Sequence, residues 1–274
     1  MQLALVFLLL GLAGCADLSP QSRWQHADQL ADKAGWQKLR IPTDKFILSA
    51  YVPKNSAQAD TLTVYIEGDG LAWLTRSQAS NDPTPRNPIA LELALRHPQG
   101  MAVYLARPCQ YVEASDAINC RQTYWTGGRF APEVVETSNQ AISALKQRVG
   151  ADKLVLIGYS GGGAIAALVA ARRNDVVRLI TVAGNLDHRA WARMHHVPAL
   201  EDSLNPVDEW QSLIDVPQRH FVGERDEIVS LDVADSYASR FPSDRRPEVI
   251  TIPDFDHVCC WVENWGSTWL KERD

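Results

Sequence analysis

The sequence of 274 residues predicts an α/β protein with a mostly parallel central sheet, helices on both faces and a small cap segment. The first observation is the segment 153–170, where an apolar run passes through a glycine-rich turn into a strong helix former. The second is the alternation of short apolar runs with helical segments, which is typical of βαβ units. The third is that polar residues follow several predicted strands, which places them at the carboxyl edge of a parallel sheet.

Short apolar runs rich in β-branched residues predict strands at 61–66, 101–106, 154–157, 176–182, 219–222 and 249–252. Helical spacing of apolar residues predicts helices at 89–95, 132–149 and 164–170. A tryptophan stripe with i, i+4, i+8 spacing predicts a last helix that packs on the sheet through Trp261, Trp265 and Trp269. The irregular segment 183–213 follows a strand on the carboxyl edge and is expected to form the small cap.

The turn between the strand at 154–157 and the following helix carries the pentapeptide Gly158-Tyr-Ser-Gly-Gly162. Glycine is needed at both ends, because a Cβ there would strike the neighbouring strand or helix. The turn holds the Ser160 hydroxyl clear of the sheet and directs the next backbone N–H groups, first that of Gly161, toward an oxyanion. Ser160 is therefore the predicted nucleophile, the alternative being a glycine-rich turn that only caps a helix.

A serine nucleophile needs a base and an acid that orients the base. His257 follows the last predicted strand and is the histidine placed to act as the base. Asp187 follows one strand, whereas Glu224 and Asp226 share the turn after the next, so three carboxylates are candidates for the acid. Asp256 adjoins the histidine and is expected to shape its loop.

These motifs make the chain resemble the α/β-hydrolase superfamily over residues 46–269. The resemblance is most specific in Gly158-Tyr-Ser-Gly-Gly162, in Gly223-Glu-Arg-Asp226 followed by Ile228-Val229, and in Asp256-His257. It implies the α/β-hydrolase fold and a serine hydrolase that acts on a carboxylic ester or related acyl substrate through an acyl-enzyme intermediate, without a cofactor. It also favours Asp226 as the acid, because the usual acid loop of the superfamily has this form.

The resemblance extends to the loop after the strand at 61–66, which in the superfamily begins with His-Gly and donates the second oxyanion N–H. Here the loop reads Glu67-Gly-Asp-Gly70, so glutamate stands where the superfamily has histidine. Asp69 is the best-aligned donor, to act together with Gly161, although Gly-Asp-Gly is also ordinary turn chemistry. The Glu67 carboxylate is expected to be tied to a nearby arginine or to backbone donors.

Three tryptophans lie in loops expected above Ser160 and are candidates to line an apolar acyl or aromatic pocket: Trp73, Trp125 and Trp191. The alternative is that each pins its own loop to the domain. Three arginines in the same loops are expected to pair with surface acids rather than with an anionic substrate: Arg107, Arg121 and Arg129.

The amino terminus has an apolar stretch at 3–12 that is too short to span a bilayer. It ends in Leu12-Ala-Gly-Cys15, which resembles the lipobox of bacterial lipoproteins, although Met1-Gln2 lacks the usual positive charge. The resemblance implies a lipoprotein signal peptide at 1–14, a lipid on Cys15, and a membrane partner through that lipid anchor. The alternative is a buried amino-terminal strand or helix.

The predicted organisation is therefore a signal peptide at 1–14, a lipidated amino terminus with a linker or helix at 15–45, and a hydrolase domain at 46–274. Ala16 follows the cysteine. By resemblance to enterobacterial sorting, this residue implies the cell envelope, at the outer membrane and facing the periplasm.

Four cysteines remain if Cys15 is lipidated, and an even number in an oxidising compartment suggests disulfides. Cys109 and Cys120 flank a short polar segment and are the predicted pair. Cys259 and Cys260 are left as either a vicinal bridge or two buried thiols. No zinc-ligand spacing occurs, so no metal is expected.

The net charge of −6 and the dispersed basic residues argue against nucleic acid as a partner. The expected partner in solution is a small acyl substrate. A rival hypothesis is a non-catalytic envelope lipoprotein that uses the hydrolase fold as a binding module.

Overall fold

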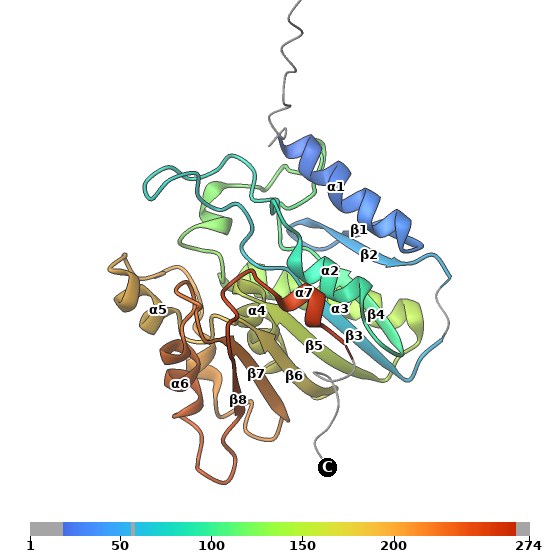
Figure 1. Cartoon of the computed structure of the whole chain (residues 1–274). Helices are drawn as coiled ribbons and strands as arrows, with labels where there is room; N and C mark the ends of the chain where they lie inside the picture. Colours follow the sequence, from blue (N-terminus) through green and yellow to red (C-terminus); the bar gives the residue numbers. More distant parts are fainter. Residues whose placement is uncertain (1–18, 56–57, 267–274) are drawn as a thin grey trace, which may run out of the picture.

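The computed structural model describes residues 19–55 and 58–266, which build one eight-stranded sheet with helices on both faces (Figure 1). The strand order is β1-β2-β4-β3-β5-β6-β7-β8, in which β2 pairs antiparallel with both β1 and β4, and the other neighbouring pairs are parallel. The bounds are β1 (Trp36–Pro42), β2 (Ile47–Pro53), β3 (Thr61–Ile66), β4 (Met101–Leu105), β5 (Lys153–Tyr159), β6 (Val176–Val182), β7 (Gln218–Gly223) and β8 (Glu248–Ile252). The predicted mostly parallel sheet is confirmed.

The helices form two layers (Figure 1). One face carries α1 (Pro20–Lys33), α2 (Ile89–Leu95) and α7 (Trp261–Asn264), and the other carries α3 (Pro132–Val149), α4 (Gly161–Ala170) and α6 (Leu231–Ala238). The helix α5 (His188–His195) and the 3₁₀ turns η1 (Gln122–Trp125) and η2 (Pro206–Glu209) belong to the connections. Alternate side chains of the strands enter the two layers, so the central strands are apolar on both faces.

Helix α4 is buried along its whole length. It is made of glycine, alanine and a few aliphatic residues, and these small side chains let it lie close to β5 and α3. Burial of so much apolar surface holds the helix firmly in place. The residue that precedes it, Ser160, is therefore presented by a rigid strand on one side and a rigid helix on the other.

The amino-terminal boundary differs from the predicted one. Strand β1 pairs with β2 from Trp36 to Pro42, and α1 packs on the sheet, where Asp28 accepts a 2.6 Å hydrogen bond from the Tyr51 hydroxyl. The folded unit thus begins well before residue 46. Edge strand β1 has mixed polarity, so periodicity did not reveal it. The predicted signal peptide and Cys15 lie outside the described residues.

Among the helices of residues 19–55 and 58–266, none is long and apolar enough to cross a membrane.

The carboxyl-terminal tryptophans do not form the predicted helical stripe. Helix α7 ends at Asn264, and Trp265 has extended backbone angles. Trp261 and Trp265 are nevertheless buried, and the Trp265 indole donates a 3.0 Å hydrogen bond to the Tyr65 hydroxyl. Packing on the sheet is thus as expected, but the helix is too short to produce it through i, i+4 spacing. Trp269 lies outside the described residues.

The predicted disulfide between Cys109 and Cys120 is present, with the two Cα atoms 5.6 Å apart. Closing so short a loop restrains the unfolded chain by about 3 kcal/mol in the chain-entropy model. The bridge anchors the segment after β4, which carries Arg107 and Gln110. These two residues contact the loop after β3, so the disulfide supports that loop.

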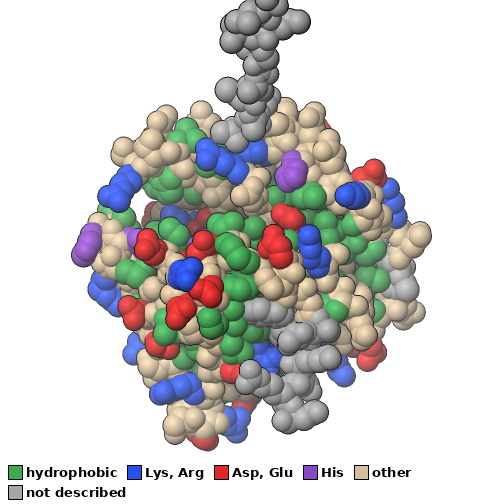
Figure 2. All heavy atoms as spheres, in the orientation of Figure 1, with side chains coloured by type: hydrophobic (Ala, Val, Ile, Leu, Met, Phe, Trp, Pro, Cys, Tyr) green, Lys and Arg blue, Asp and Glu red, His purple; other side chains and the backbone are tan. Residues whose placement is uncertain are grey.

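Figure 2 shows basic and acidic side chains intermixed over one face of the molecule, with apolar side chains between them. This distribution on the visible face agrees with the dispersed charge expected from the sequence.

Candidate active site

The loops that carry the predicted site emerge from one edge of the sheet. Ile66 pairs with Gly158 across β3 and β5, and Val182 pairs with Phe221 across β6 and β7. The carboxyl ends of these parallel strands therefore lie side by side at one edge of the sheet. Polar groups that follow different strands meet there, as is usual for binding sites in open α/β sheets.

Ser160 stands at a tight turn between β5 and α4, with φ 52° and ψ −122°. A non-glycine residue with positive φ carries strain on the order of 1–3 kcal/mol, and its surroundings hold it there. The Ser160 N–H donates to Val182 O at 2.9 Å, and its carbonyl accepts from the Asn185 N–H at 3.0 Å. A Cβ at Gly158 would lie 2.2 Å from Gly162 O, so this turn requires glycine there, as predicted.

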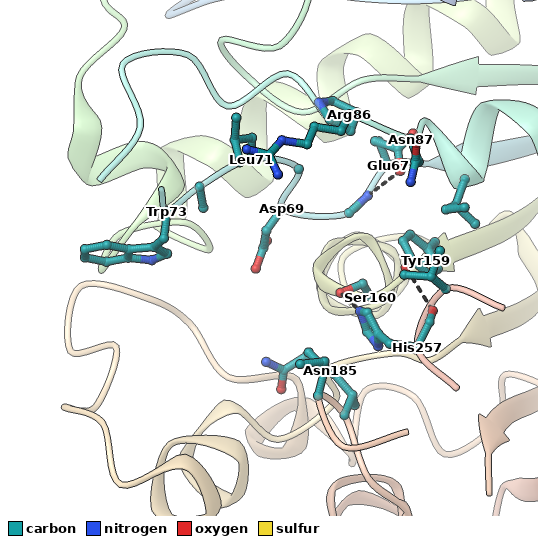
Figure 3. Close-up of a pocket in the computed structure, with 18 of the residues that line it drawn as sticks. Glu67, Asp69, Leu71, Trp73, Arg86, Asn87, Tyr159, Ser160, Asn185 and His257 are labelled. Atoms are coloured by element: carbon teal, nitrogen blue, oxygen red, sulfur yellow. Dashed lines mark hydrogen bonds between the residues drawn. The ribbon is translucent and has the colours of Figure 1, made fainter. Parts of the chain in front are cut away.

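The Ser160 hydroxyl and the His257 ring point toward each other across the end of α4 (Figure 3). Ser160 Oγ lies 3.0 Å from His257 Nε2, and His257 Nδ1 lies 2.8 Å from Asp226 Oδ2. The three side chains come from the loops after β5, β7 and β8. They form one continuous chain of hydrogen bonds.

Of the three candidate acids, only Asp226 contacts the histidine. Its side chain is fully buried, and its Oδ1 accepts from the backbone N–H groups of Ile228 and Val229, both at 2.8 Å. Glu224 instead accepts from the Asp254 N–H at 3.3 Å, on the exposed side of its turn. Asp187 caps α5 and accepts a 2.6 Å hydrogen bond from the Ser236 hydroxyl.

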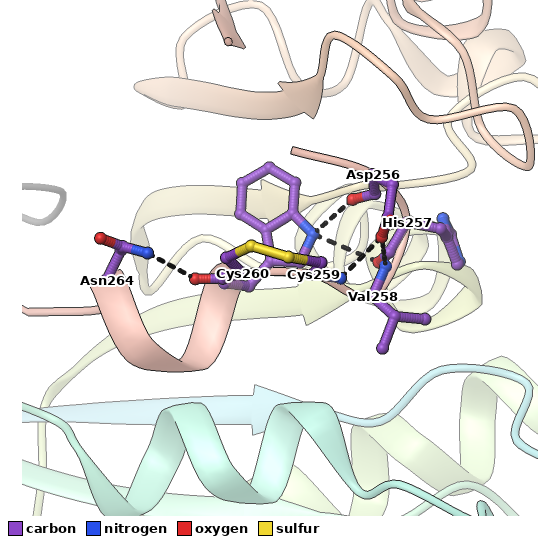
Figure 4. Close-up of a disulfide and its surroundings, with 7 residues drawn as sticks. Asp256, His257, Val258, Cys259, Cys260 and Asn264 are labelled. Atoms are coloured by element: carbon purple, nitrogen blue, oxygen red, sulfur yellow. Dashed lines mark hydrogen bonds between the residues drawn. A yellow bond between two sulfur atoms is a disulfide. The ribbon is translucent and has the colours of Figure 1, made fainter. Parts of the chain in front are cut away.

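The loop that carries His257 is held from both sides. The Tyr159 hydroxyl donates to His257 O at 3.0 Å, and the Trp261 indole lies within hydrogen-bond distance of the same carbonyl. Asp256 accepts from the Val258 and Cys259 N–H groups, so it shapes the loop as expected. Directly beyond these residues, Cys259 and Cys260 form a vicinal disulfide (Figure 4), which decides between the two alternatives left by the sequence.

Glu67 is almost completely buried, and of the two kinds of partner expected for its carboxylate, backbone donors are the ones that bind it. Its carboxylate accepts from the Gly68 N–H at 2.9 Å and from the Tyr104 hydroxyl at 3.1 Å, with Ala90 N at 3.4 Å. Backbone donors are therefore among its partners, as expected. Burial raises the pKa of the Glu67 carboxyl to about 7, although these hydrogen bonds act in the opposite direction.

Two of the three arginines that were expected to pair with surface acids are buried instead. Arg107 and Arg129 are buried, and both bind the Asp69 carboxylate, at 3.2 Å and 2.6 Å respectively. Burial by itself would raise the pKa of Asp69, but the two guanidinium groups more than offset it, so the pKa lies below its usual value. Arg121 is exposed. Sequence polarity could not distinguish the buried arginines from the exposed one.

The two predicted oxyanion donors are backbone groups, the N–H of Asp69 and the N–H of Gly161. Neither donates a hydrogen bond to an acceptor within the described part of the chain. Gly161 begins α4, where the first N–H groups of the helix have no intrahelical partner. Both groups are thus available to a bound ligand.

A cavity of about 420 Å³ opens beside Ser160 and His257. Its walls include two of the three predicted tryptophans, Trp73 and Trp191, together with Leu71 and Ile228. Trp125 was predicted to line the pocket and does not. It is buried in the core, where its indole donates to Ser80 O at 3.0 Å, so it pins its own loop.

The segment 183–213 contributes little to the cavity. Only Asn185 and Trp191 reach its walls, and the Trp191 indole donates to Ile228 O at 2.9 Å. This hydrogen bond ties α5 to the loop that follows Asp226. The Asn185 side chain is buried, and its Oδ1 has no hydrogen-bond partner within the described residues.

Among residues 19–55 and 58–266, no group of three histidine, cysteine or carboxylate side chains is arranged to hold a metal ion.

Comparison of the sequence with protein-family models and with curated proteins gives no match. Solved structures do resemble the chain. An esterase from Pyrococcus furiosus superimposes with a TM-score of 0.54 at 13% identity, over 81% of this chain and 82% of that one. Est1E from Butyrivibrio proteoclasticus gives 0.57 at 14% identity, over 82% and 93%.

An α/β hydrolase from a Penicillium species, GrgF, gives a TM-score of 0.58 at 14% identity, over 84% of this chain and 93% of that one. Structural similarity at such low sequence identity shows a shared fold, and the same fold can support many different reactions. Together with the sheet order described above, these similarities show that the protein has the α/β-hydrolase fold.

Proposed function

We propose that the protein is a serine hydrolase that cleaves a carboxylic ester or a related acyl substrate. The observation that carries the proposal is the chain of hydrogen bonds from Ser160 Oγ through His257 to Asp226, at 3.0 Å and 2.8 Å. A nucleophile within hydrogen-bond reach of a base, which is in turn oriented by a carboxylate, is the arrangement that activates serine. Structural neighbours named as esterases and hydrolases support the same class of reaction.

In the proposed mechanism, Ser160 Oγ attacks the substrate carbonyl while His257 Nε2 accepts the hydroxyl proton. Asp226 keeps Nδ1 protonated and stabilises the imidazolium that forms. The N–H groups of Asp69 and Gly161 donate to the oxyanion of the tetrahedral intermediate. His257 then protonates the leaving group, and the remaining acyl-enzyme is hydrolysed by a water molecule from which His257 takes a proton.

The walls of the cavity suggest the kind of group that is bound. Trp73 and Trp191 present large apolar surfaces near Ser160, which favour an aliphatic acyl or aromatic group of modest size. Esters, thioesters, lipids and amides all use this chemistry, so the proposal extends to the acyl class and not to one substrate.

A fluorophosphonate probe tests this proposal directly, because it forms a covalent adduct only with an activated serine. We expect rapid labelling, with the adduct on the Ser160 peptide in mass spectrometry, and hydrolysis of p-nitrophenyl esters with a clear optimum of acyl length. A folded protein that is not labelled and cleaves no ester would instead support the rival hypothesis of a binding module.

We also propose that the mature protein begins at a lipidated Cys15 in the cell envelope. The motif Leu12-Ala-Gly-Cys15 supports this, and the two disulfides are of the kind that persists in oxidising compartments. Mass spectrometry of the membrane fraction is expected to find a diacylglyceryl or triacyl adduct on the peptide that begins at Cys15. A protein that retains Met1 and carries no lipid would contradict the proposal.

A further inference from the structure

We propose that Gln110 and the ion cluster of Arg107, Asp69 and Arg129 position the Gly68–Asp69 peptide so that its N–H serves as an oxyanion donor. This inference rests on the proposed function and concerns side chains that do not touch the reacting atoms, whereas the Asp69 backbone N–H does. In this sense they are positioning residues.

The first support comes from the carbonyl end of this peptide. The Gln110 side chain donates from Nε2 to Gly68 O at 3.0 Å, and its Oε1 accepts from the Arg107 N–H, also at 3.0 Å. A trans peptide is planar, with its C=O and N–H directed to opposite sides. Holding Gly68 O therefore also sets the direction of the Asp69 N–H.

The second support comes from the side chain of Asp69. Its two oxygens are bound separately, Oδ1 by Arg107 Nη1 and Oδ2 by Arg129 Nη1. The two guanidinium groups are themselves fixed by backbone carbonyls. Arg107 donates to Arg129 O, and Arg129 Nε donates to Thr126 O at 2.7 Å. The cluster leaves the Asp69 backbone little freedom to rotate.

The segment that supplies Gln110 is itself rigid. Cys109 and Tyr111, on either side of Gln110, both have positive φ, of 71° and 56°. Such angles persist in non-glycine residues only where the surroundings enforce them. Here Cys109 is bonded to Cys120, and the Tyr111 N–H donates to the Thr84 hydroxyl at 2.9 Å.

The negative charge of Asp69 makes it possible to distinguish two roles of this side chain: positioning of the Gly68–Asp69 peptide, and a direct electrostatic effect on the oxyanion. An ideal Cβ on Gly161 would fall 2.0 Å from Asp69 Oδ1, so the carboxylate packs directly against the residue that supplies the other oxyanion donor. A negative charge at this place opposes an oxyanion. If Asp69 were only a neighbouring charge, its neutralisation would raise kcat. If it positions the peptide, neutralisation lowers kcat.

The test uses the full chain with the variants Asp69→Asn and Gln110→Met, which nearly preserve side-chain size. We expect each to lower kcat for a p-nitrophenyl ester by about 10- to 100-fold, since small errors in placement are costly. KM should change by about twofold or less. Inhibition by a trifluoromethyl ketone, which forms an oxyanion adduct with Ser160, should weaken by about the same factor as kcat.

Further variants and a folding measurement complete the design. Arg129→Lys retains a charged donor and is expected to lose less activity than Arg129→Met, whereas Arg121→Gln, at an exposed arginine, should match the wild type. Circular dichroism melting identifies any variant that fails to fold. In that case the kcat of Arg129→Lys is compared with that of the wild type.

Two results would overturn the inference in different ways. Unchanged or increased kcat in Asp69→Asn and Gln110→Met, in an active wild-type background, contradicts the positioning role alone. A folded wild type that cleaves no ester and resists the fluorophosphonate contradicts the proposed function and this inference with it.

Discussion

Replacing Ser160 with alanine is expected to lower kcat by about a thousandfold or more while the protein remains folded. The substitution removes the atom that attacks the substrate and leaves the oxyanion donors in place, which accounts for residual catalysis. The positive φ of 52° strains alanine and serine alike, so the turn should keep its shape. Steady-state hydrolysis of a p-nitrophenyl ester and thermal melting by circular dichroism check both parts.

The matched control is Ser239→Ala. Ser239 is an exposed serine after α6 whose hydroxyl donates to the nearby Ser236 carbonyl, so its loss should leave kcat unchanged. A Ser160→Ala protein that keeps half of the wild-type activity would show that another group performs the reaction.

Asp226→Asn is expected to lower kcat by about a thousandfold or more. The fully buried Asp226 accepts from His257 Nδ1 and from two backbone N–H groups. Its replacement by an amide turns one oxygen into a donor. That donor favours the tautomer with the proton on Nε2, which cannot take the proton of Ser160. Measurement of kcat together with a thermal melt distinguishes this effect from unfolding.

The rival carboxylates provide controls for this prediction. Glu224→Gln and Asp187→Asn should each reduce kcat by about tenfold or less, because neither side chain contacts His257. Asp187→Asn should also retain the cap on α5, because asparagine is as good an N-cap as aspartate. An inactive Asp187→Asn protein beside a nearly normal Asp226→Asn protein would assign the acid to the loop after β6.

Local patterns in the sequence determined the parts of the fold whose periodicity is strong. The strands at 61–66 and 176–182 and the helices at 89–95 and 132–149 have the predicted bounds, because their apolar residues are buried on regular faces. The tight turn around Ser160 could also be predicted from its glycines, since steric contact across the turn excludes a Cβ at these positions. Edge strand β1 lacks such periodicity, whereas the tryptophan spacing from residue 261 predicted a helix that continues past Asn264, where α7 ends. Contacts with the sheet define both elements.

The identities of Ser160 and His257 as site candidates were thus determined by the sequence, through the order of strands and the residues that follow them. The resemblance favoured Asp226 over Asp187 and Glu224, but the contact itself depends on the tertiary structure. The register of β6, β7 and β8 brings the loop after β7 to His257, and the conformation of that turn directs Asp226 rather than Glu224 to the ring. The same is true of Arg107 and Arg129, which look like surface residues in the sequence. Their burial against Asp69 depends on loops distant in the chain meeting at one edge of the sheet, and a linear pattern of side chains does not contain that information.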